Sequence, residues 1–116
     1  MSQRQDLRQI TTLAQLVLDH RLTGLRLAAA ELARSKAQLR AINASTAPVD
    51  LAPIAAGVVE VSYQRWADIR RAELNATIAR QTAAWIDART EAGTAFGRVQ
   101  ALHAIATGME GKRQLS

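Results

Sequence analysis

The sequence contains no cysteine, few aromatic residues and little proline or glycine. Without cysteine, a disulfide framework and a thiolate metal site are both excluded. Two tryptophans, one tyrosine, one phenylalanine, two prolines and six glycines in 116 residues leave little bulk for a globular core and few places to turn. The β-branched residues never alternate over a useful length, so strands are not expected either.

Long apolar runs are also missing. None approaches the ~20 residues of a membrane span, and the first residues, MSQRQDLRQ, are too polar for a secretory signal. We therefore expect a cytoplasmic protein without a transmembrane segment.

What the chain does contain is helix-forming sequence, rich in alanine, leucine, arginine and glutamine. It is broken clearly once, by NASTAPVDLAP at residues 43–53, which holds both prolines. The pattern predicts a helix over about 6–44, a loop over 45–53, a second helix over about 54–106 and a flexible tail over 107–116. A connection this short makes the helices antiparallel. The expected fold is all-α, an elongated antiparallel two-helix coiled-coil hairpin in which residues 1–116 form a single domain.

A leucine repeat supports the coiled coil in the first helix. Leucine recurs every seventh residue and alternates with mostly small residues, which is typical of a coiled-coil seam. The seam leucines are Leu18, Leu25, Leu32 and Leu39.

The second helix carries two apolar stripes that face nearly opposite ways, and one hairpin partner can cover only one of them. The sequence does not identify which stripe faces the first helix. The candidate seam is placed on the narrower, alanine-rich stripe, represented by Ile69, Ala76, Ala83 and Ile86. The other stripe comprises Leu74, Ile78, Trp85, Ala88, Ala92, Val99, Leu102 and Ala106. Whichever stripe is left over must meet solvent, a second copy or another protein.

Catalytic and metal-binding chemistry finds no support in the residue pattern. Paired carboxylates such as Asp87 and Glu91 read as a solvated helix face, because general acid–base catalysis needs a pocket that shifts their pKa values. His20 and His103 lack a third ligand in any metal-binding spacing, and no glycine-rich phosphate loop is present. We expect neither an enzyme, nor a metal site, nor a cofactor. Gly93 and Gly97 form a GxxxG that suggests close helix packing.

The formal net charge of +5 admits nucleic acid, an anionic membrane or an acidic protein as partner. Four arginines of the second helix recur every nine residues, about 900° of rotation, so successive ones alternate sides. They form no single basic stripe, which disfavours nucleic acid. These arginines are Arg71, Arg80, Arg89 and Arg98.

The aromatic residues are candidates for contact with other proteins. Tyr63 and Trp66 share a face just after the loop, with Arg70 one turn beyond. They either pack on the loop or form an aromatic and basic docking surface, the residue types enriched at interfaces. The candidate partner-binding residues are Tyr63, Trp66, Arg70, Trp85, Phe96 and Arg98.

The stretches YQRWADIRRAELNATIARQ and EAGTAFGRVQALHAIA, after a long helix and a short polar turn, resemble the flagellar export protein FliJ and its relatives in type III secretion. The resemblance covers most of the chain, although the chain is shorter than is usual for that family. It implies a two-helix stalk that inserts into the hexameric export ATPase and links it to the membrane export gate, peripheral to the membrane. It also implies gate contacts near Tyr63, Trp66 and Arg70, and ring contacts at the distant ends near Arg4, Arg8 and Arg98. A self-associating helical scaffold and a basic nucleic-acid-binding helical protein stay open as alternatives.

Overall fold

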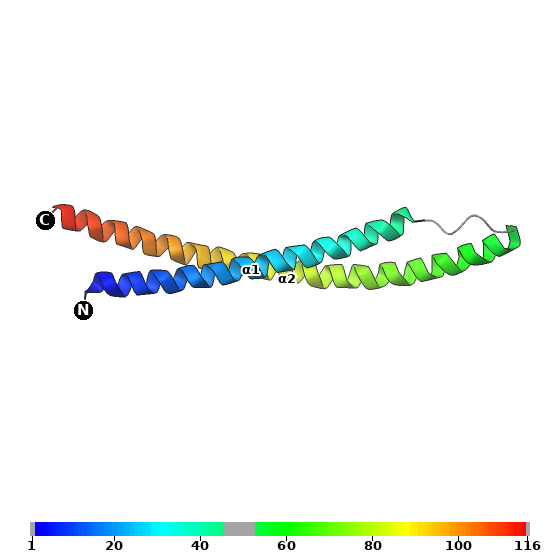
Figure 1. The fold of residues 1–116 in the computed structure, drawn as a ribbon, viewed down its shortest axis with the longest axis horizontal. Helices are drawn as coiled ribbons and strands as arrows, with labels where there is room; N and C mark the ends of the chain where they lie inside the picture. Colours follow the sequence, from blue (N-terminus) through cyan, green and yellow to red (C-terminus); the bar gives the residue numbers. More distant parts are fainter. Residues whose placement is uncertain (1, 46–52, 116) are drawn as a thin grey trace. The chain divides into compact units, whose positions relative to one another are not determined.

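The computed structural model describes residues 2–45 and 53–115, and two long helices account for nearly all of them (Figure 1). Helix α1 spans Gln3–Ala44 and helix α2 spans Pro53–Leu115. The described residues contain no strand, so the all-α prediction is confirmed. Most of the predicted loop, residues 46–52, lies outside the described part of the chain.

Local signals fix three of the helix ends. The Ser2 hydroxyl accepts a hydrogen bond from the Gln5 backbone N–H at 3.2 Å, and so caps the start of α1. At the other end of α1, the Ser45 hydroxyl donates to the Ile42 carbonyl at 3.1 Å. Helix α2 begins at Pro53, a residue that suits the first helical position because its missing N–H would have no partner there.

The C-terminal segment differs from the prediction. Residues 107–115, expected to form a flexible tail, continue α2 to Leu115. The glycines there, Gly108 and Gly111, have ordinary helical backbone angles. Met109 is partly buried, and Lys112 and Arg113 lie in the last turn, where cations favour the helix dipole. Packing and charge together outweigh the weak helix preference of glycine.

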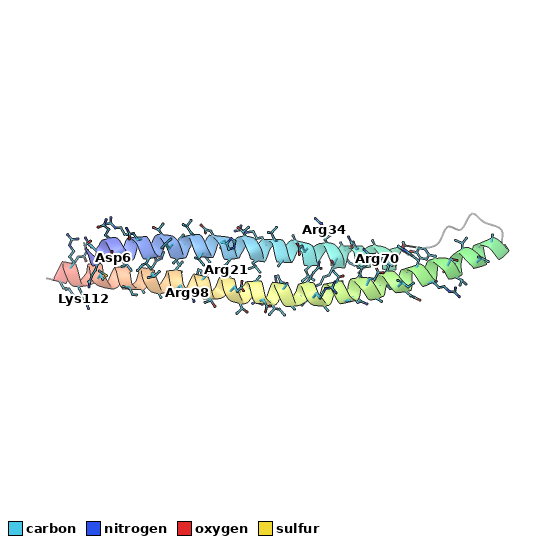
Figure 2. The ribbon with its side chains drawn as sticks, turned by 90° about the horizontal axis from the view of Figure 1, so that it is seen from below. Asp6, Arg21, Arg34, Arg70, Arg98 and Lys112 are labelled. Atoms are coloured by element: carbon cyan, nitrogen blue, oxygen red, sulfur yellow. The ribbon has the colours of Figure 1, made fainter. Side chains whose placement is uncertain are left out.

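The helices form two compact units, each built from a segment of α1 and a segment of α2. Unit 1 comprises Met1–Ala28 and Trp85–Ser116, and unit 2 comprises Ala29–Ala84. In unit 1, Leu18 of α1 packs against Ala95 and Val99 of α2. Arg21, which follows Leu18 in the sequence, forms an ion pair with Glu91, which precedes Ala95. The two segments therefore run antiparallel (Figure 2).

Unit 2 has the same antiparallel arrangement. Its buried cluster comprises Ile42, Ala67 and Leu74, with Leu39 and Tyr63 packed against it. The predicted leucine seam of α1 is divided between the units. Leu18 and Leu32 are buried, and Leu25 and Leu39 are partly buried.

The second-helix seam requires a correction. Ile69, Ala76, Ala83 and Ile86 are all exposed, and the opposite stripe, with Leu74, Ala92 and Val99 buried, faces α1 instead. Burial free energy grows with the apolar area removed from water. The stripe that contains Leu74, Trp85, Val99 and Leu102 offers more area than one made mostly of alanine and glycine. The alanine-rich stripe is therefore the one left over.

Candidate protein-binding surfaces

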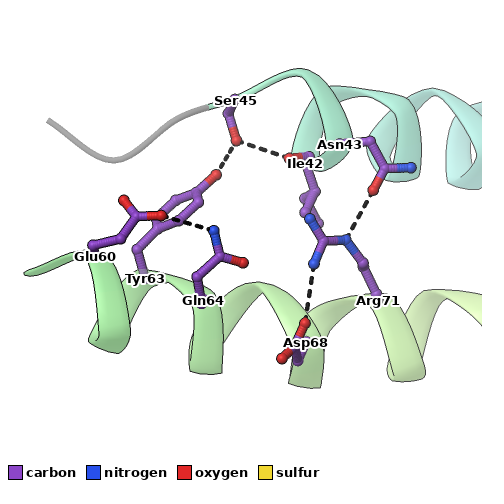
Figure 3. Close-up of polar contacts among 8 residues, drawn as sticks. All are labelled: Ile42, Asn43, Ser45, Glu60, Tyr63, Gln64, Asp68 and Arg71. Atoms are coloured by element: carbon purple, nitrogen blue, oxygen red, sulfur yellow. Dashed lines mark hydrogen bonds and ion pairs between the residues drawn. The ribbon is translucent and has the colours of Figure 1, made fainter.

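Tyr63 fixes the end of unit 2 next to the undescribed residues. Its hydroxyl forms a hydrogen bond with the Ser45 hydroxyl, and its ring packs against the cluster of Ile42, Ala67 and Leu74 (Figure 3). Ser45 in turn bonds to the carbonyl of Ile42. Tyr63 thus ties α2 to the end of α1, which is one of the two roles that the sequence predicted for it.

Trp66 is placed differently from its neighbour. The Trp66 and Tyr63 ring centroids are 5.7 Å apart with the ring planes tilted by 41°. Trp66 nevertheless keeps 52% of its surface exposed, and Ile69, three residues further along, keeps 62%. Trp66 therefore has Tyr63 as an aromatic neighbour, while about half of its surface stays accessible to a partner.

The two arginines that follow bind within unit 2. Arg70 donates to Glu73 at 3.1 Å and across to Gln38 of α1 at 3.3 Å. Arg71 donates to Asp68 at 3.1 Å and across to Asn43 of α1 at 2.8 Å (Figure 3). Arg70 is only partly exposed, and much of its hydrogen-bonding capacity is used inside the unit.

Sequence reasoning missed Gln38, Asn43, Ser45 and Arg71 as members of this cluster. The pairs Asp68–Arg71 and Arg70–Glu73 have the i, i+3 spacing that a helix brings together, so these two were readable in the sequence. The contacts to α1 depend on the register between the helices, which nothing in the sequence fixes.

The remaining candidates lie in unit 1. Trp85 is partly buried on the stripe that faces α1, and the Arg89 guanidinium lies 5.6 Å from its ring centroid, a cation–π contact. Phe96 and Arg98 are exposed. Trp85 therefore belongs to the helix–helix packing, whereas Phe96 and Arg98 are accessible to a partner.

The two edges of unit 1, where α1 and α2 meet at the surface, differ in polarity. One edge is an open apolar groove lined by Ile10, Leu13, Ala14, Val17, Ala95, Arg98, Ala101 and Leu102. The other is lined mainly by polar residues, including Arg8, Thr12, His103 and Glu110. An apolar stripe broader than a two-helix seam is what a helix shows when it packs against more than one neighbour.

The described residues do not meet the requirements of a metal site or of a membrane-spanning helix. Within residues 2–45 and 53–115, no three histidine, aspartate or glutamate side chains come together as metal ligands would. His20 and His103 are both exposed. In the same part of the chain, neither helix contains a stretch long and apolar enough to cross a membrane.

No family model, curated protein or solved structure matches the chain.

Proposed function

We propose that the chain is a non-enzymatic coiled-coil adaptor that binds other proteins through the exposed side of α2. The proposal rests on the difference in exposure between the two apolar stripes of α2. Leu74 and Val99 are buried on the side facing α1, whereas Ile69 and Ile86 are exposed on the other side. Large apolar side chains left at the surface in a repeated pattern mark interaction surfaces more often than isolated ones do.

Within that class, we assign the protein to a bacterial flagellar, or type III, export apparatus, as a stalk that couples the export ATPase ring to the export gate. The support is the resemblance of YQRWADIRRAELNATIARQ and EAGTAFGRVQALHAIA to the FliJ family, together with a two-helix fold. In this role the protein is cytoplasmic and peripheral to the membrane, and its partners are the ATPase hexamer and the gate.

Within this proposal, the contacts of unit 2 favour two side chains for the gate contact. Tyr63 is engaged with Ser45, and Arg70 with Glu73 and Gln38. Among the described residues, the Trp66 side chain makes no such bond, and both Trp66 and Ile69 are exposed, so we place the gate contact on these two side chains. Tryptophan is among the residues that most often dominate binding energy at interfaces.

Unit 1 supplies the ring contact in this proposal. Arg98 and Phe96 are exposed there, whereas Val99 of the larger stripe packs against Leu18 of α1 and Ala92 is buried. The ring contact therefore rests on the exposed side chains, and the larger stripe serves to hold the helices together.

A pull-down with purified export ATPase and with the cytoplasmic part of the export gate tests the proposal. We expect Trp66→Ala to weaken gate binding on the order of 10-fold or more, as loss of an aromatic anchor does. Val61→Ala is the matched control, since Val61 is 53% exposed in the same unit, and it should bind as the unmodified chain does. Circular dichroism should show equal helicity for both variants. Failure of the unmodified chain to bind either component would refute the assignment to the export apparatus.

A further inference from the structure

The apolar groove of unit 1 continues onto a stripe of α1 that no other described residue covers. The stripe runs through Asp6, Ile10, Leu13, Val17 and His20, whose spacings of four and three residues keep them on one side of a helix. Its three central side chains are exposed, Leu13 most of all. A carboxylate closes the stripe at one end and an imidazole closes it at the other.

The order of these residues is self-complementary. Suppose that two copies of α1 lie antiparallel with a two-fold axis at Leu13. A residue a given number of positions before Leu13 in one copy then lies opposite the residue the same number of positions after Leu13 in the other copy. Leu13 then faces itself, and Ile10 lies opposite Leu16 of the second copy. Val17 lies opposite Gln9, and Asp6 lies opposite His20. An isologous dimer interface has this property, because the same surface patch serves both subunits.

Charge and hydrogen bonding agree with the pairing. Within the described residues, the Asp6 carboxylate and the His20 imidazole make no side-chain hydrogen bond or ion pair. Across the two-fold axis, each imidazole N–H donates to the carboxylate of the other copy. The polar opposite edge, with Arg8, Thr12 and Glu110, offers no equivalent arrangement.

We propose that the apolar edge of unit 1 is a dimer interface that binds a second copy of this chain, with Leu13 at the two-fold axis. Ile10, Leu13, Leu16 and Val17 of the two copies form its apolar centre, and Asp6–His20 pairs close both ends. The Arg98 stem covers the rim while its guanidinium stays in water. This interface lies in unit 1, apart from the Trp66–Ile69 surface of unit 2. It shares Arg98 with the ring contact proposed above, so a second copy and the ATPase ring would compete for this edge.

Sedimentation equilibrium on the full chain tests the proposal. We expect the unmodified chain to dimerise and Leu13→Glu to weaken the dimer on the order of 100-fold, because two carboxylates would meet at the axis without a partner. Ile69→Glu is the matched control, since Leu13 and Ile69 are both 62% exposed, and it should leave the dimer intact. A monomeric unmodified chain, or a dimer lost in Ile69→Glu and kept in Leu13→Glu, would overturn the interface.

Cysteine cross-linking gives a second readout that does not rely on a destabilising charge. The natural sequence has no cysteine, so Leu13→Cys introduces one thiol per chain. A thiol at the two-fold axis meets its own copy, and mild oxidation should yield a covalent dimer on a non-reducing gel. Ile69→Cys should stay monomeric on that gel. Equal cross-linking of the two variants would contradict the assigned axis.

The end pairs are tested by exchanging charge. Asp6→Lys should weaken the dimer by placing an ammonium group opposite His20. Adding His20→Glu to that variant should restore it, because a carboxylate then lies opposite the introduced ammonium group. A double variant as weak as Asp6→Lys alone would exclude the predicted register.

Discussion

Gln81 is a polar side chain on the packed stripe of α2. It lies one heptad after the buried Leu74 and is itself partly buried. Its side-chain oxygen is shielded from solvent and has no hydrogen-bond partner among the described residues. A buried polar atom without a partner lowers stability, and a polar residue at one seam position also restricts the registers that a coiled coil accepts.

Replacing Gln81 by leucine should therefore stabilise the protein. We expect Gln81→Leu to raise the free energy of unfolding by about 1 kcal/mol, from the added apolar burial and the removed polar atom. Urea unfolding followed by circular dichroism measures the change. Gln100→Leu is the control, because Gln100 is exposed, and its effect should stay within about 0.5 kcal/mol. A loss of stability in Gln81→Leu would mean that the amide has a partner that the packing does not reveal.

At the scale of the helices, much of the structure was readable in the sequence. Uninterrupted helix formers predicted two long helices, and the heptad leucines of α1 marked the side that packs, with Leu18 and Leu32 buried. The end of α2 was predicted wrongly, because glycine preference was weighed without the packing of Met109. The choice between the stripes of α2 was wrong for a related reason. The residue spacing predicts both stripes equally well. They differ in the apolar area that each can bury against α1, which is larger for the stripe of Leu74 than for the stripe of Ile69.

The candidate surfaces were predictable to a smaller extent. The residue types at Trp66 and Phe96 predicted contact surfaces, and both side chains are exposed. Their roles relative to Tyr63 and Trp85, which pack inward, depend on the rotation of α2 about its own axis. A sequence without a fixed register does not determine that rotation.

Gly93 and Gly97 lie at positions of α2 where the backbone conformation does not require glycine. Both lie inside α2 with ordinary helical backbone angles. Apart from the adjoining backbone of α2 itself, no atom of the described residues lies within 4 Å of the place where a Cβ would stand at either position. The close helix packing suggested by their spacing is thus not made by these two residues within the described chain.

The variant Gly93→Ala/Gly97→Ala should consequently be more stable than the natural chain. Each change should add about 1 kcal/mol, since alanine loses less backbone freedom than glycine on entering a helix. A thermal melt followed by circular dichroism should show a higher midpoint. Ala104→Gly, at an exposed position in the same unit, should lower the midpoint by about half as much, because it changes one residue instead of two. A double variant that melts below the natural chain would show that another backbone or subunit approaches these glycines.

For the whole molecule, the imbalance between the helices matters most. Helix α2 has 63 residues and α1 has 42, and α2 carries apolar side chains on two sides. Each compact unit buries one of these sides against its segment of α1, through Leu74 in unit 2 and Val99 in unit 1. The proposed functions use what each unit leaves exposed, namely Trp66 and Ile69 in unit 2 and the apolar edge around Leu13 in unit 1.

The choice of stripe on α2 is the central claim, and thiol accessibility measures it most directly. Because the chain lacks cysteine, Leu74→Cys and Ile69→Cys each carry a single thiol whose labelling rate reports its exposure. Leu74 is 2% exposed and Ile69 is 62% exposed, so Ile69→Cys should react rapidly and Leu74→Cys should react slowly until denaturant is added. Rapid labelling of Leu74→Cys in the folded protein, with Ile69→Cys protected, would show that the opposite stripe faces α1.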